Sequence, residues 1–127
     1  MPDPTHVDSG RYAEDLAAAY LALCGYAVLD RNFRFSRLEI DLVARKENVL
    51  AVVEVKFRRR FRKGGALRAV GPRKQRDLET AAVGYLRVRE VRGVRVRFDV
   101  IAIETGTNGL TLRHVPNAFP ATGRYRA

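Results

Sequence analysis

The chain has 127 residues, of which 46% are apolar and 30% charged, a composition that fits one folded domain spanning residues 1–127 with its own core. No apolar run reaches the roughly 18–20 residues that a membrane-spanning helix needs, and "MPDPTHVDSG" lacks the basic and apolar regions of a secretory signal. A lone cysteine, Cys24, excludes an internal disulfide and fits a reducing compartment. We therefore expect a cytoplasmic protein without membrane association.

The net charge of +10 is concentrated in one segment of the chain. Residues 58–97 contain 14 Lys and Arg against 3 Asp and Glu, a net of +11, whereas residues 1–57 contain 7 against 9, a net of −2. Such a basic segment favours a polyanionic partner, usually nucleic acid. The alternative is a solvated surface in an arginine-rich protein.

The first predicted element is a helix over about residues 10–24, ended by Gly25. Its apolar residues follow helical spacing and predict one broad buried face that includes Leu23 and Cys24. A short strand is expected next, over about residues 26–34.

A β-hairpin is predicted after that strand, with strands over about residues 38–45 and 49–57. Because strand side chains alternate between faces, Glu54 and Lys56 share one face and leave the other to the core. If the two strands pair, Asp41 converges with Glu54 and Lys56. Glu39 shares the face of Asp41 and is equally well explained as a rim charge.

This arrangement suits phosphodiester hydrolysis. Carboxylates of Asp41 and Glu54, with the backbone carbonyl between Glu54 and Lys56, are the oxygen ligands that Mg²⁺ or Mn²⁺ prefers. Such a cation activates water, and the Lys56 ammonium can stabilise the charge that develops. The alternative is a cross-strand salt bridge on a solvated face, worth only about 0.2–1 kcal/mol.

A basic loop follows the hairpin and leads into a second helix over about residues 72–89, which Pro72 opens. Guanidinium groups suit phosphate oxygens, and interleaved Phe rings can stack on bases. The alternative for this loop is a solvated segment. The predicted nucleic-acid contacts are Arg58, Arg59, Arg60, Arg62 and Lys63 in the loop and Lys74 and Gln75 in the first turn of the helix.

The remaining elements are a strand over about residues 94–104, a short edge strand at "GLTLRHV", and a loose tail from Pro116. The buried stripe of the second helix is predicted as Leu78, Ala81, Ala82, Tyr85 and Leu86. Asp99 is expected to pair with Arg95 or Arg97 outside the site. His6 and His114 lack metal-ligand spacing and are expected at the surface.

The order of these elements, with "EIDLVA" and "VEVKFR" on the hairpin, resembles the PD-(D/E)XK nuclease core. Together with "AEDLAAAYLALCGYAVLDRNFR", "GPRKQRDLETAA" and "RFDVIAIE", these segments cover roughly residues 10–104 and are similar to the small bacterial YraN-like family (UPF0102). That family is grouped with Holliday-junction-resolvase-like endonucleases. The resemblance implies an α/β, restriction-endonuclease-like αβββαβ core with a mixed central sheet flanked by helices.

The resemblance also implies site residues. Asp41 and Glu54 would bind Mg²⁺, Lys56 would assist catalysis, and Glu14 on the first helix would complete the metal site. The alternative for Glu14 is a carboxylate favoured by the helix dipole. Leu38 stands where the family usually has glycine, which puts the approach of a DNA backbone in question.

The predicted function is a metal-dependent endonuclease acting on branched or otherwise structured DNA, and RNA fits the same chemistry. Resolvases that cut symmetric junctions act as dimers, so the resemblance also raises a homodimer, although no sequence feature identifies a dimer face. One alternative is a non-catalytic nucleic-acid-binding module that retains the nuclease fold. A more remote one is an accessory protein whose basic segment binds an acidic protein.

Overall fold

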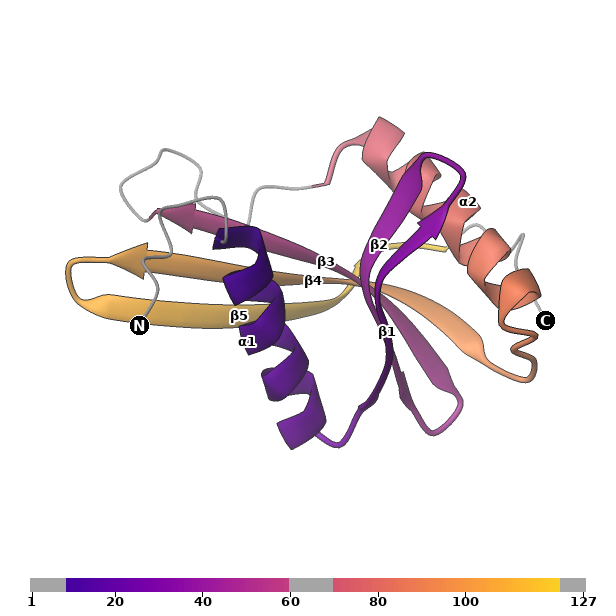
Figure 1. The fold of residues 1–127 in the computed structure, drawn as a ribbon, viewed down its shortest axis with the longest axis horizontal. Coiled ribbons are helices and arrows are strands. Elements are labelled where there is room, and N and C mark those ends of the chain that lie inside the picture. Colours follow the sequence, from indigo (N-terminus) through magenta and orange to yellow (C-terminus); the bar gives the residue numbers. More distant parts are fainter. Residues whose placement is uncertain (1–8, 60–69, 122–127) are drawn as a thin grey trace.

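A computed structural model of the chain describes residues 9–59 and 70–121 (Figure 1). It confirms the predicted α/β class, with a mixed sheet and a helix on each side of it, consistent with a restriction-endonuclease-like core. In chain order the elements are α1 (Ser9–Leu23), β1 (Ala27–Phe35), β2 (Leu38–Lys46), β3 (Val49–Arg59), α2 (Pro72–Val88), β4 (Arg95–Gly106) and β5 (Gly109–Phe119). Within the described ranges, no helix combines the length and the apolar character needed to cross a membrane.

The sheet has the strand order β1-β2-β3-β4-β5. Among the described strands, only β3 and β4 run parallel, and the connection between them carries α2, the usual form of a parallel crossover. The antiparallel β2–β3 pairing ends at Leu42↔Val53, whereas β3 stays paired with β4 as far as Arg59. Figure 1 shows the β1–β2 hairpin turning away from β3 and β4 towards α2.

The two helices cover opposite faces of the sheet, and alternate residues of β3 pack against α1 and against α2. Ala51 and Val53 pack with α1, whereas Leu50 and Val52 pack with α2. The stripe predicted for α2 is buried as expected: Leu78, Ala81, Ala82, Tyr85 and Leu86. The face of β3 that bears Glu54 and Lys56 is therefore the continuation of the α2 side of the core.

The prediction for the end of α1 was wrong. Leu23 is 89% exposed and Cys24 is also exposed, so neither is a core residue. The buried stripe consists of Ala13, Ala17 and Leu21. Leu23 follows Leu21 by two positions, which turns its side chain about 200° round the helix and away from the sheet.

The tail predicted from Pro116 also needs correction. β5 continues to Phe119, which pairs with Phe98 and stacks on its ring at a centroid distance of 4.8 Å. Pro116 is tolerated because β5 is an edge strand. Its pairing with β4 also shifts register here, between Phe98 and Val100 of β4. Residues 122–127 of the predicted tail lie outside the described residues.

Candidate metal and nucleic-acid site

Asp41 and Glu54 meet where β2 stops pairing with β3. They are the residues immediately beyond the last pair, Leu42↔Val53. The backbone N–H of Val55 donates to Asp41 Oδ2 at 2.8 Å, which ties this carboxyl group to β3. The end of the ladder thus places two carboxyl groups side by side on one face of the sheet.

The electrostatics of this pair are unusual. Burial and then the neighbouring charge of Glu54 raise the pKa of Asp41 to about 7, despite the opposing effects of the Val55 N–H and Lys74. The Glu54 side chain is only 15% exposed, and among the described residues its buried Oε1 has no hydrogen-bond partner. A proton held between the two carboxyl groups, or a cation, would satisfy that oxygen.

Further carboxylates lie next to Asp41. Ligand oxygens of Glu14, Glu39 and Asp41 all lie within 4.8 Å of one another, an arrangement that could hold a metal ion. Glu14 lies beyond the first turn of α1, where the helix dipole has little effect. Burial raises the pKa of Glu14, while its hydrogen bond from Asn32 lowers it and Asp41 raises it further.

Lys74 is the cation that the structure brings to these carboxylates from α2. Its Nζ lies 3.7 Å from Glu54 Oε2, as expected for a residue in the first turn of α2. Gln75 instead donates from Nε2 to the Val70 carbonyl at 2.8 Å and so secures the chain entering α2. Lys56 is half-buried on the same strand as Glu54.

The basic loop is only partly described. Arg58 is exposed, and its guanidinium donates to the Phe57 carbonyl at 2.7 Å. The side chain of Arg59 and the whole of Arg60, Arg62 and Lys63 lie outside the described residues. Their contact with nucleic acid stays a prediction.

The carboxylates Glu14, Glu39, Asp41 and Glu54 form what we call the acidic site. Two residues in or beside it, Glu39 and Asn32, did not stand out in the sequence. Glu39 was equally consistent with a rim charge, and Asn32 lay within a strand without any special pattern. Asn32 Nδ2 donates to Glu14 Oε1 at 3.0 Å and to Glu39 Oε2 at 3.1 Å. The alternation of β2 already placed Glu39 on the face of Asp41, but it did not distinguish a member of the site from a rim charge.

A second polar cluster lies under the C-terminal half of α1, at Asp99. Arg97 pairs with Asp99 as predicted, but His114 is only 11% exposed, so its prediction as a surface histidine was wrong. Its ring contacts Asp99 through Nε2 and the Tyr20 hydroxyl through Nδ1. Burial alone would raise the pKa of Asp99, but hydrogen bonds from His114, Arg97 and the Asn117 N–H lower it overall. This cluster joins α1 to β4 and β5.

Comparison with known proteins identifies the relatives of the chain. A model described as "Uncharacterised protein family UPF0102" matches residues 13–103. The chain is 43% identical to a UPF0102 protein of Syntrophotalea carbinolica over 114 residues, covering 90% of this chain and 93% of the relative. It is 47% identical over 98 residues to one of Chlorobaculum parvum, covering 77% and 76%. The matched range contains the whole acidic site.

Proposed function

The chain belongs to the uncharacterised protein family UPF0102, and we propose that it is a metal-dependent endonuclease that cuts branched or otherwise structured DNA in the cytoplasm. The observation that carries this proposal is the half-buried pair of Asp41 and Glu54, in which the buried atom Glu54 Oε1 has no hydrogen-bond partner among the described residues. Two adjacent carboxylates that are largely withdrawn from water are costly in a folded protein unless a cation or proton compensates them.

The donor set fits Mg²⁺ or Mn²⁺, which prefer carboxylate oxygens. Glu14 and Asp41, whose ligand oxygens lie within 4.8 Å of each other, would hold the ion together with Glu54, whose orphaned Oε1 is a ready ligand. When bound, the cation supplies charge neutralisation and activates water for attack on phosphorus.

The chain's own cations have separate roles in this proposal. Lys56 shares a strand face with Glu54, where its ammonium would stabilise negative charge that develops on the phosphate. Lys74 reaches the rim of the site from α2 and is exposed enough to contact a phosphate. The loop residues 58–63 would hold the backbone of the nucleic acid, which gives affinity without sequence readout.

A cleavage assay tests this function. Labelled linear duplex, single strand, flap and four-way junction are incubated with the wild type, Lys56→Ala and Glu54→Gln in Mg²⁺ or Mn²⁺. We expect cutting by the wild type, strongest on a branched substrate, and at least about a 100-fold loss in both variants. Light scattering on the same samples shows whether the active species is a homodimer.

An exposed carboxylate provides the matched control. Glu47, at the turn between β2 and β3, is exposed, so Glu47→Gln should cut as the wild type does. Binding of these substrates without cleavage in either metal would contradict the proposal. It would favour the alternative, a nucleic-acid-binding module that has the fold without the turnover.

A further inference from the structure

The side chain of Asn32 connects two carboxylates that belong to different elements. Its Nδ2 lies 3.0 and 3.1 Å from the two oxygens of Glu14 on α1 and 3.1 Å from Glu39 Oε2 on β2. A neutral amide donates hydrogen bonds but brings no positive charge. The contact therefore holds two negative groups together without neutralising them.

The ion pair that Glu39 forms with Arg34 of β1 compensates the two carboxylates weakly. Arg34 forms an ion pair with Glu39 Oε1 at 3.2 Å, but the Arg34 side chain is 72% exposed. Exposed pairs of this kind contribute little. Arg31 on the same strand is paired with Asp15, and its charge lowers the pKa of Glu14 less than the Asn32 hydrogen bond does.

The backbone of Asn32 is shaped for this contact. Asn32 has φ = 53°, the left-handed region, although it lies inside β1 between the paired residues Arg31 and Phe33. Asparagine is one of the few residues that adopt this conformation readily. In the β1–β2 register this position faces Asp41, so the amide is presented at the acidic site.

We propose that Glu39 is a further ligand of the cation site and that Asn32 is the residue that positions it, by holding Glu39 against Glu14 beside Asp41. Glu39 then joins Glu14 and Asp41 in a three-carboxylate cluster whose ligand oxygens lie within 4.8 Å of one another and come from α1 and β2, with Glu54 of β3 next to Asp41. The inference rests on the proposed cation site, but it concerns ion binding and does not require that nucleic acid is cut.

A Mn²⁺ titration by calorimetry tests this assignment on the full-length, metal-free protein without nucleic acid. Glu39→Gln removes the charge at constant size, and Asn32→Gly removes the amide while permitting the positive φ. We expect each variant to bind Mn²⁺ about 10-fold or more weakly than the wild type, as is typical when a ligand or its hydrogen-bond partner is lost. Glu47→Gln, the control, should match the wild type.

The melting temperature of each metal-free variant separates positioning from stability. A purely structural Asn32 would lower the melting temperature and leave the Mn²⁺ affinity of the folded protein unchanged, which would overturn the proposal. Wild-type affinity in Glu39→Gln, or no Mn²⁺ binding by the wild type, would overturn it as well. Weaker binding in both variants with no cleavage by the wild type would support this inference while contradicting the proposed nuclease.

Discussion

Folding moves the carboxyl group of Asp41 out of water and places it beside the carboxyl group of Glu54. Burial first, and the Glu54 charge second, raise its pKa from 3.8 to about 7. Between these two values the folded chain keeps a proton that the unfolded chain releases. The free energy of unfolding contributed by Asp41 therefore falls as the pH rises from about 4 to about 7.

Asp41→Asn removes this titration and keeps an oxygen that can accept from the Val55 N–H. In EDTA we expect the variant to be more stable than the wild type at pH 8, by about 1–3 kcal/mol, because one unit of pKa shift corresponds to about 1.4 kcal/mol. The difference should shrink towards pH 4.5. Urea unfolding at the two pH values measures it.

Mn²⁺ gives the complementary test at this residue. The ion should stabilise the wild type at pH 8 and have little effect on Asp41→Asn, because only the folded wild type presents the complete ligand set. In the urea experiment without metal, an equal stability difference between Asp41→Asn and the wild type at pH 8 and at pH 4.5 would contradict the raised pKa of Asp41.

The alternation of polar and apolar residues was sufficient to predict that Asp41 and Glu54 converge. It could not predict Asn32, because an asparagine inside a strand has no distinctive spacing and its role depends on a contact with Glu14, 18 positions away in the chain. The burial of His114 could not be predicted for the same reason, since its partner Tyr20 is 94 positions away in the chain.

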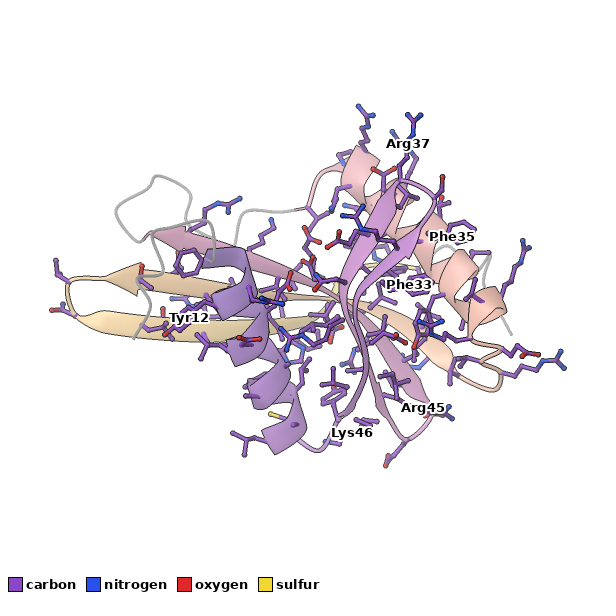
Figure 2. All side chains as sticks on the ribbon, viewed as in Figure 1. Tyr12, Phe33, Phe35, Arg37, Arg45 and Lys46 are labelled. Carbon is purple, nitrogen blue, oxygen red and sulfur yellow. The ribbon has the colours of Figure 1, made fainter. Side chains whose placement is uncertain are left out.

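Packing against α2 sets the position of the β1–β2 hairpin. This hairpin carries Asn32, Glu39 and Asp41. Figure 2 shows Phe33 and Phe35 extending from β1 towards α2, and the Phe33 ring lies edge-on to Tyr85 at 4.8 Å. Three residues before Phe33 on the same strand, Asp30 accepts a hydrogen bond through Oδ1 from Arg89 Nη2 at 2.9 Å. The geometry of the acidic site thus depends on α2.

Gly84 is the position in α2 that admits Phe35. A Cβ atom there would lie 2.3 Å from Phe35 Cδ1, so Gly84→Ala must displace the ring. We expect a loss of about 1–3 kcal/mol of stability from overpacking, together with weaker Mn²⁺ binding because the hairpin shifts. Urea unfolding and the calorimetric titration measure the two effects.

The control for this substitution is Gly10→Ala in α1. Within residues 9–59 and 70–121, no atom lies within 4 Å of a Cβ built at Gly10, so alanine there should not destabilise the chain and should gain at most about 0.5–1 kcal/mol through helix propensity. Similar gains at both glycines would show that Phe35 does not fix the hairpin.

β5 is stabilised at its far end by Phe119, which is 5% exposed and stacked on Phe98. Phe119→Ala should cost about 3 kcal/mol, close to the loss expected for a buried aromatic residue. Leu110→Ala, at a side chain on the same strand that is 42% exposed, should cost less than about 1 kcal/mol. Equal small effects in thermal unfolding would mean that Phe119 contributes little to the core.

The charge of the whole molecule leads to a prediction about salt. A chain of net charge +10 with an acidic site needs its basic residues to bring a polyanion to that site. We expect nucleic-acid affinity to fall at least about 10-fold between 50 and 200 mM salt, because counterions are released on binding. Fluorescence anisotropy with a labelled duplex measures this change.

Two variants on α2 and just beyond it locate the contact. Lys74→Gln should weaken binding and reduce the salt slope by about 1, as for one lost phosphate contact. Arg92→Gln removes an exposed charge after the C-terminal end of α2 and should change neither. Equal effects of the two substitutions would indicate diffuse attraction rather than a surface at the acidic site.

The order of the elements, the buried stripe of α2 and the two faces of β3 could be read from the amino-acid sequence alone, because periods of 2 and 3.6 residues are local properties of a chain. The burial of His114, the extension of β5 to Phe119 and the meeting of Asn32, Glu39 and Glu14 required the folded arrangement. Each depends on strand register or on a crossing of distant segments, and no local pattern encodes where two such segments meet.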